Sequence, residues 1–331
     1  MIPKVPWKLN ISLENASPFR YGFFIILFLV PFINYHMTLS KNIELFPLYL
    51  IAPIFLGIGF WDKSKLFLVF FSTVIVFFRL YLTQEPTSNI VNFAILAFVY
   101  MLITLISVHL TKNYRKSNRN KLEVILSLAK SLDSRDPYTG SHSEKVAKYA
   151  LMIAKELKLS HKDCEAVYIG GLLHDIGKIG VPEHILLKSS QLTSEEYDII
   201  KKHPVKGFKT IEHISSFREN GVLDMVLYHH ERFDGKGYPF GKKGEEIPLT
   251  ARIIAVADTF DAMTSKRVYR NKLNLEYVYN EIKANKGLQF DPLIAEVFLK
   301  ILKRQGTKIF MHTSDQLDEK EMRLNLNEQF G

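Results

Sequence analysis

The chain has 331 residues, a formal net charge of +9 and a single cysteine, Cys164. This length fits two modules better than one small binding domain, and a lone cysteine excludes an intramolecular disulfide framework. The basic residues form no long block, so a polymeric nucleic acid is not expected as a partner. Charge is divided unevenly, because residues 1–110 hold only 11 charged side chains and the rest of the chain holds 66. The two parts are therefore expected to face different solvents.

Four apolar stretches occupy the first part, at residues 19–39, 44–61, 66–82 and 90–110. Each is close to the ~20 residues that a helix needs to cross the hydrocarbon core of a bilayer. The first stretch is not followed by a small-residue cleavage site, which argues against a signal peptide that is removed. We therefore predict a membrane domain with about four transmembrane helices over residues 1–110.

The basic residues around these stretches predict an orientation. Lysines and arginines precede the first stretch, separate the second from the third and follow the fourth, whereas the two other loops offer only Lys41. The positive-inside rule places the base-rich segments in the cytoplasm. We expect a multi-pass protein of the inner (cytoplasmic) membrane, with both termini and the soluble part on the cytoplasmic side.

Residues 111–135 are predicted to connect the membrane domain to the soluble part. The run from Lys112 to Lys121 is basic and is expected to meet anionic lipid headgroups. Apolar residues at helical spacing follow, namely Leu122, Ile125, Leu128, Ala129 and Leu132. This segment is either the first helix of the soluble domain or a short coil that pairs two chains. Continuity with the fourth span motivates an expected homodimer.

The soluble part, over residues 121–305, shows helical apolar spacing almost throughout and predicts an all-α domain. Its longest loop covers residues 233–248 and is rich in glycine and proline. A long, well-marked loop inside a compact helical domain is more often functional than structural. Residues 306–331 are polar and are expected to form a frayed tail or a peripheral helix.

Histidines and acids at several positions suggest a metal centre. His174 and Asp175 stand in an otherwise apolar helical run, where they would be costly to bury unpaired. A metal removes this cost, since one carboxylate can bridge two cations, and Lys178 lies on the same side of the helix, where it can meet a phosphate. Mixed nitrogen and oxygen ligands suit two iron, manganese or similar ions. The further candidate ligands are His142, His203, His229, His230 and Asp258.

The order of these residues resembles the HD-GYP domain family, a branch of the HD superfamily. The resemblance covers roughly residues 121–304, and the membrane region carries no motif of its own. The matching segments are residues 135–140, His142, residues 174–180, 203–204, 229–231 and 234–239, Arg252 and residues 257–264. The family implies a metal-dependent phosphodiesterase, a phosphoric diester hydrolase that converts cyclic di-GMP to linear pGpG and in some members onward to GMP.

The resemblance also implies a role for each matching residue. Asp175 would bridge two metal sites and, with Lys178, would be catalytic. One site would be completed by His142, His174 and Asp258, and the other by His203, His229 and His230.

Substrate contacts are implied in the same way. Lys178 would meet the scissile phosphate, and Arg267 and Arg270 match positions that meet substrate phosphates, although both also fit as surface bases. A loop beside the site is associated in this family with GGDEF-type diguanylate cyclases as partners. Its residues are Gly237, Tyr238 and Pro239.

One position departs from a subset of the family. Members with three metals have a glutamate four residues before the histidine that corresponds to His142, where this chain has Tyr138. A phenol, with a reference pKa near ~10, is a poor replacement for a carboxylate ligand. We therefore expect two divalent metal ions, iron or manganese, and pGpG as the main product.

Three other functions remain open at this stage. A different HD-type nucleotide phosphohydrolase would not need the histidine pair His229–His230 or the loop at residues 237–239. A cyclic di-GMP receptor without turnover is compatible with the fold, but degenerate domains usually lose metal ligands and this chain keeps them. A transporter or channel with a regulatory domain is disfavoured because the apolar stretches lack paired charges.

Overall fold

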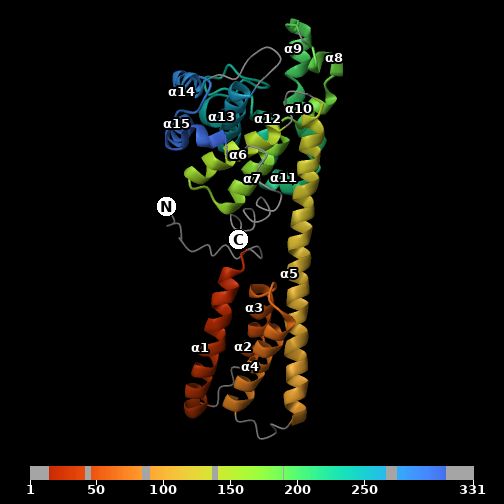
Figure 1. Cartoon of the computed structure of the whole chain (residues 1–331), viewed down its shortest axis with the longest axis vertical. Helices are drawn as coiled ribbons and strands as arrows, with labels where there is room; N and C mark the ends of the chain where they lie inside the picture. Colours follow the sequence, from red (N-terminus) through yellow and green to blue (C-terminus); the bar gives the residue numbers. More distant parts are fainter. Residues whose placement is uncertain are drawn as a thin grey trace. The chain divides into compact units, whose positions relative to one another are not determined.

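The computed structural model describes residues 15–41, 46–83, 90–135, 141–188, 190–265 and 274–310. Helices and loops make up these ranges, and their one β-type contact is an isolated bridge between Lys286 and Phe290. The all-α expectation is therefore confirmed for the described residues (Figure 1). The chain forms two compact units that divide between Lys121 and Leu122.

The first unit consists of helices α1 to α4 and the beginning of α5. The bounds are α1 Ser17–Lys41, α2 Phe46–Tyr49, α3 Ile51–Gly59, α4 Lys65–Thr83 and α5 Ile90–Asp133. Helix α5 continues without interruption from the apolar stretch through the basic run that follows it.

The second apolar stretch, residues 44–61, does not form a single helix. Helix α2 ends at Tyr49 and α3 begins at Ile51, with a break at Leu50. Pro53 explains the break, because it has no N–H to donate to the Tyr49 carbonyl and its ring crowds that group. Hydropathy alone does not register this interruption.

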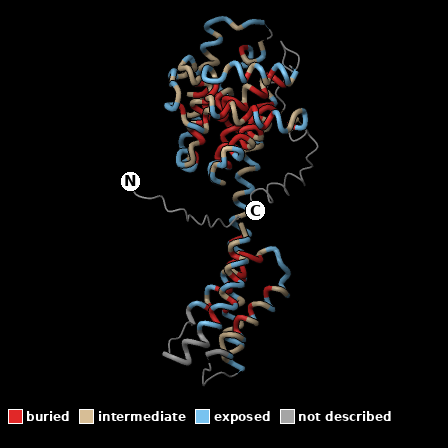
Figure 2. The backbone as a smooth tube through the Cα atoms, turned by 90° about the vertical axis from the view of Figure 1, so that its left-hand side faces the viewer, coloured by how far each residue is buried: buried red, intermediate tan, exposed pale blue. Residues whose placement is uncertain are grey.

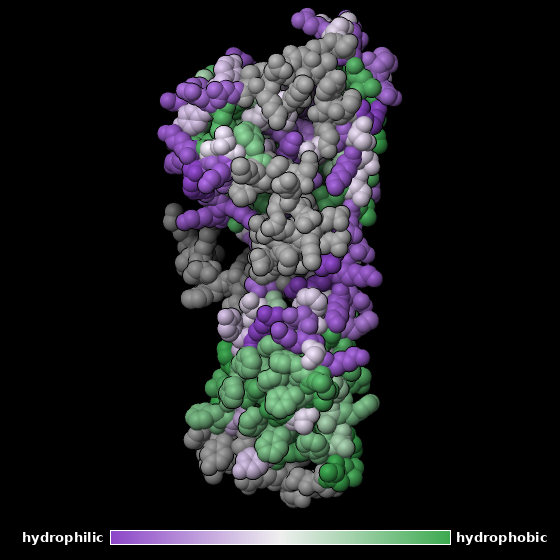
Figure 3. All heavy atoms as spheres, in the orientation of Figure 1, coloured by the Kyte–Doolittle hydropathy of each residue, from purple (hydrophilic) through white to green (hydrophobic). Residues whose placement is uncertain are grey.

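Both the core and the outer faces of the first unit are apolar. Phe23, Leu56 and Tyr100 are fully buried between its helices, whereas Phe28 and Phe98 are 64% and 70% exposed. The hydrophobic colouring of this unit in Figure 3 reflects such outward-facing side chains. An exposed apolar surface of this extent is unusual for a protein surrounded by water.

Among the described residues, α5 is the one helix that is long and apolar enough to cross a membrane. The described apolar part of α1, Ser17–Ile33, is shorter. One of the four expected transmembrane helices therefore meets this criterion of length and composition, and the other three remain predictions.

The second unit contains the end of α5 and the following helices. In chain order these are α6 His142–Glu156, α7 His161–Leu173, η1 Ile176–Gly180, α8 Glu183–Leu186, α9 Ser194–Ile200, α10 His203–Ile211, α11 Ser215–Glu219, α12 Val222–Tyr228, η2 Gly244–Glu246, α13 Leu249–Thr264, α14 Leu275–Ala284, α15 Pro292–Gln305 and η3 Gly306–Phe310. Helix α6 packs against α7 and α13, and α12 packs against α7, α10 and α13.

A single hydrophobic core runs through this unit and appears as the buried interior in Figure 2. The ring of Phe260 on α13 meets Tyr149 of α6 edge-on at 4.8 Å between centroids, and meets Phe298 of α15 at 4.9 Å. These contacts hold α6, α13 and α15 together. Ile309 of η3 is also fully buried, so the start of the predicted tail belongs to the core. The remainder, residues 311–331, lies outside the described residues.

The end of α5 belongs to the second unit. Leu122, Ile125 and Ala129 pack against its core, whereas Leu128 is 49% exposed. This packing favours the alternative in which the segment is the first helix of the soluble domain. An interchain coil would need these same apolar side chains for a second chain.

The short helix η1, which follows α7, requires a glycine where it packs against α10. Residues of η1 lie directly on the beginning of α10, and a Cβ atom at Gly177 would collide with the carbonyl oxygen of His203. Any larger residue would push η1 away from α10. Gly177 thus brings the segment after α7 close to the helix that begins with His203.

Candidate metal centre

Asp175 lies at the centre of a buried group of histidines and acids. It follows His174 at the end of α7 and is only 5% exposed. Its Oδ2 atom lies 3.3 Å from Nε2 of His174, and its Oδ1 atom lies 3.2 Å from Nε2 of His203. The two oxygens of one carboxylate therefore face two different sets of side chains.

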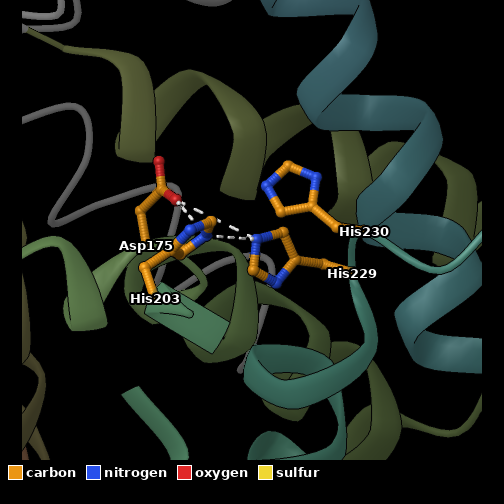
Figure 4. Close-up of side chains that lie close together, drawn as sticks. All are labelled: Asp175, His203, His229 and His230. Atoms are coloured by element: carbon orange, nitrogen blue, oxygen red, sulfur yellow. Dashed lines mark hydrogen bonds and ion pairs between the residues drawn. The ribbon is translucent and has the colours of Figure 1, made fainter. Parts of the chain in front are cut away.

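All seven predicted metal ligands come together in these two sets. Within each set, the possible ligand atoms lie within 4.8 Å of one another. Figure 4 shows one set, with the His203 and His229 rings facing the Asp175 carboxylate and His230 beside them. This set consists of Asp175, His203, His229 and His230, and the other consists of His142, His174 and Asp258.

Three of the histidines are held by the ends of helices. The Nδ1–H groups of His174, His203 and His229 donate to the carbonyl oxygens three residues earlier, at 2.8, 2.7 and 2.9 Å. Those carbonyls belong to the last turns of α7, α9 and α12, where helices leave carbonyl groups without an intrahelical partner. A carbonyl can only accept, so each imidazole keeps its proton on Nδ1 and presents the Nε2 lone pair to the centre.

The nitrogen atoms in the centre fit a cation. Nε2 of His203 and Nε2 of His229 lie 3.2 Å apart. With both protons on Nδ1, these atoms are two acceptors that no hydrogen bond can join. Nε2 of His174 and Oδ1 of Asp175 are also buried without a hydrogen-bond partner. A divalent cation in each set would satisfy these lone pairs, and such a donor set of nitrogen and oxygen suits iron or manganese.

The protonation states favour cation binding by the set around Asp175. Burial opposes ionisation of Asp175, but the Lys178 ammonium, 2.5 Å from Oδ2, holds the pKa of this carboxyl well below its usual value. Burial lowers the pKa of His229 well below its usual value and lowers the pKa of His230 to about 3. Both imidazoles are therefore neutral near pH 7, which is the form that binds metals.

The other set predicts a pH dependence of metal binding. Burial alone would lower the pKa of His142, but hydrogen bonds to Asp258 and Asp261 outweigh it and raise the pKa to about 10. A cation must therefore displace a proton from this imidazole at any lower pH. We expect the affinity for one cation to fall as the pH is lowered from 8 to 6, by up to ~10-fold per pH unit. The affinity for the second cation should fall less, because His229 and His230 are already neutral over this range.

Titration of the metal-free protein with Mn²⁺ at several pH values would measure both affinities. Equal weakening of the two cations, or no pH dependence for either, would contradict this expectation.

Lys178 lies in η1, and hydrogen bonds from Arg135 hold η1 in place. The guanidinium of Arg135 donates to the carbonyl oxygens of Lys178, Ile179 and Val181 at 3.1, 3.1 and 3.3 Å. These bonds keep the turn in place and leave the Lys178 ammonium beside Asp175. The sequence placed Arg135 at the start of the matching segments but gave no sign of this role.

The loop after α12 covers one side of the centre. The ring of Tyr238 lies over His230 with centroids 4.7 Å apart, and the Tyr238 N–H donates to the His230 carbonyl at 3.2 Å. A Cβ at Gly237 would lie 2.6 Å from Cα of Glu231, so only glycine permits this approach. The structure thus places Gly237, Tyr238 and the adjoining Pro239 beside one metal ligand set.

Glu231 fixes this loop through two backbone groups. Its buried carboxylate accepts hydrogen bonds from the N–H groups of Phe240, at 2.8 Å, and Lys242, at 3.0 Å. We expect Glu231→Ala to lower the free energy of unfolding by ~1–3 kcal/mol, because two loop N–H groups lose their charged acceptor. The exposed Glu245 of the same loop provides the matched control. Thermal unfolding of the full-length protein would test this, and equal stability of both variants would contradict it.

Three residues named in the sequence analysis lie outside the described residues, and one residue at the centre was not named there. Tyr138, Arg267 and Arg270 lie outside the described residues. Asp261, which the sequence analysis did not single out, is fully buried and accepts a hydrogen bond from Nδ1 of His142 at 2.7 Å. Its spacing could have indicated a place near the metal ligands, since Asp261 lies one helical turn after the predicted ligand Asp258.

The two adjoining sets of imidazole and carboxylate ligands in this helical domain are suited to binding metal ions. Residues 127–294, more than half of the chain, match the HD domain family. The chain therefore belongs to the HD domain family.

Curated relatives share this part of the chain. A cyclic di-GMP phosphodiesterase of Thermotoga maritima is 40% identical over 194 residues, which cover 59% of this chain and 52% of the relative. The cyclic di-GMP phosphodiesterase response regulator RpfG of Xanthomonas campestris pv. campestris is 37% identical, with 54% and 47% covered. The 3'3'-cGAMP-specific phosphodiesterase 1 of Vibrio cholerae is 40% identical over 159 residues, with 48% and 36% covered. The chain thus spans about half the length of these relatives, or less.

Proposed function

We propose that the protein is a membrane-bound, metal-dependent phosphodiesterase that hydrolyses cyclic di-GMP to linear pGpG. The observation that carries this proposal is the Asp175 carboxylate, which belongs to one ligand set and lies 3.3 Å from His174 of the other, with the Lys178 ammonium beside it. The similarity to relatives named cyclic di-GMP phosphodiesterases supports the choice of substrate.

The residues of the centre would have different roles in hydrolysis. Two divalent cations, when bound, would activate water and offset the charge that develops on the phosphate oxygens. Asp175 would be a ligand to the cations, and Lys178 would place a positive charge on a non-bridging phosphate oxygen. Water would add to phosphorus while the bond to the 3' oxygen breaks, and that oxygen would leave as a hydroxyl group. No nucleophilic side chain is required.

The cofactors are proposed as two iron or manganese ions. The nitrogen-rich ligand sets suit either ion. Because Tyr138 replaces the glutamate expected of a third site, we propose no third metal. For the same reason pGpG, rather than GMP, is the proposed main product.

The membrane assignment also belongs to this proposal. Helix α5 has the length and composition of a transmembrane helix, and the first unit exposes large apolar side chains on its outer faces. We propose a multi-pass protein of the inner membrane, with the catalytic domain on the cytoplasmic side and regulated by the membrane region. A homodimer and GGDEF-type cyclases are the proposed protein partners.

Substrate turnover by the full-length protein in detergent would test the proposal. Metal-free protein, loaded in turn with Fe²⁺ and Mn²⁺ under anaerobic conditions, is given cyclic di-GMP, and the products are separated by chromatography. We expect two metals per chain and conversion to pGpG, and metal-free protein as the control should be inactive. Binding of the nucleotide without turnover under either metal would instead favour the receptor function.

One observation favours a second substrate. The Vibrio cholerae relative, as similar in identity as the first, is named as specific for 3'3'-cGAMP. A parallel assay with this dinucleotide separates the two functions. Faster turnover of cyclic GMP-AMP than of cyclic di-GMP would replace the proposed substrate while leaving the metal centre unchanged, and turnover of neither would favour another nucleotide.

A further inference from the structure

His142 is held differently from the other tethered histidines. His174, His203 and His229 use the carbonyl groups at the ends of preceding helices. His142 is the first residue of α6 rather than a residue at the end of a helix. Its Nδ1 atom instead lies 2.7 Å from Oδ2 of Asp261, and both side chains are buried.

Helix α13 holds this imidazole from both sides. Asp258 and Asp261 are three residues apart and lie on one face of α13. Oδ1 of Asp258 lies 3.3 Å from Nε2 of His142, while Asp261 faces Nδ1. The second oxygen of Asp261 accepts a hydrogen bond from the hydroxyl of Ser265 at 3.1 Å, which limits rotation of the carboxylate.

A carboxylate behind a metal-binding imidazole has a known physical effect. It retains the Nδ1 proton, orients the ring and makes Nε2 a stronger donor to the cation. Asp261 meets these conditions for His142 alone, because His174, His203 and His229 are supported by neutral carbonyl groups. One ligand set therefore contains an imidazole held by a carboxylate, whereas the tethered imidazoles of the other set are held by backbone carbonyls.

We propose that Asp261 is a positioning residue that fixes the His142 ring and thereby sets the affinity of the cation bound by His142, His174 and Asp258. This inference rests on the proposed metal centre. It predicts that the loss of Asp261 weakens one cation selectively and leaves the cation of Asp175, His203, His229 and His230 in place.

The experiment uses the full-length protein, freed of metal and titrated with Mn²⁺, with bound metal counted after equilibrium dialysis. Asp261→Ala is expected to weaken one of two Mn²⁺ affinities by ~10–100-fold. In Asp261→Asn an amide oxygen can still accept the Nδ1–H bond, so this variant should recover part of the loss. Thr264→Val, the matched control on the same helix, removes a hydroxyl that donates to the Phe260 carbonyl and should bind both ions as the wild type does.

The melting temperature of each metal-free variant separates positioning from a structural role. Two Mn²⁺ ions bound by Asp261→Ala with wild-type affinities would overturn the inference. Equal weakening of both ions, together with a lower melting temperature of the metal-free protein, would overturn it in favour of a structural role. A wild-type protein that binds no Mn²⁺ would refute the proposed metal centre itself, and the inference with it.

Discussion

Asp175→Asn should reduce the turnover of cyclic di-GMP by ~10³-fold or more, because it weakens both ligand sets at once. The two oxygens of this carboxylate face His174 on one side and His203 on the other. An asparagine keeps the shape of the side chain but has one neutral acceptor oxygen and no charge. We therefore expect fewer than two metals per chain as well as the loss of turnover.

A buried aspartate outside the centre gives the matched control. Asp291 is also 5% exposed, and it caps α15 through the N–H groups of Leu293 and Ile294. Asp291→Asn should lower the melting temperature but retain both metals and the specific activity of the folded protein. If Asp175→Asn kept two metals and wild-type turnover, the shared-carboxylate arrangement would be wrong.

Lys178→Met should lower kcat by ~10²–10³-fold while both metals remain bound. The ammonium of Lys178 is 2.5 Å from Oδ2 of Asp175, and no ligand atom of the two sets comes from this side chain. Methionine retains an unbranched apolar stem and removes the ammonium, which donates to Asp175 and carries the charge that we assign to a phosphate oxygen. The loss should therefore appear in turnover rather than in metal content.

Lys206 provides a control of the same residue type, since it lies near η1 and donates to the Gly180 carbonyl at 2.7 Å. Lys206→Met should leave kcat close to the wild-type value. Metal loss in Lys178→Met would show that Lys178 acts by holding Asp175 rather than by meeting the substrate, and similar activity of both variants would remove its assigned role.

The metal ligands could be predicted from the sequence because of the chemistry of their side chains. An imidazole or a carboxylate in an apolar helix needs a partner, and this alone singled out His174, Asp175 and Asp258. The structure brings them together with the other predicted ligands. The remaining histidines were named as candidates in the same way, and the resemblance to a family then assigned each ligand to one of two sites.

The residues that hold the metal ligands and Lys178 in place could not be predicted from the sequence in the same way. Asp261 acts on His142 from 119 positions away, and Arg135 reaches η1 from more than 40 positions away. Such roles depend on which helices pack together, and helical periodicity does not specify the neighbours of a helix. The break at Leu50 was missed for a simpler reason, since hydropathy averages composition and ignores where Pro53 falls within a helix.

The carbonyl bonds of His174, His203 and His229 restrict which substitutions evolution can accept at these positions. Imidazole has two nitrogen atoms on opposite sides of one ring, so it can close a helix end and bind a cation at the same time. Cysteine or glutamate can bind a cation, but in the form that does so it cannot also donate a hydrogen bond to the carbonyl group three residues earlier. An exchange of ligands that would satisfy the metal would therefore leave the end of α7, α9 or α12 without its cap. Drift toward other ligand types at these positions should be rare, even where a different metal would tolerate it.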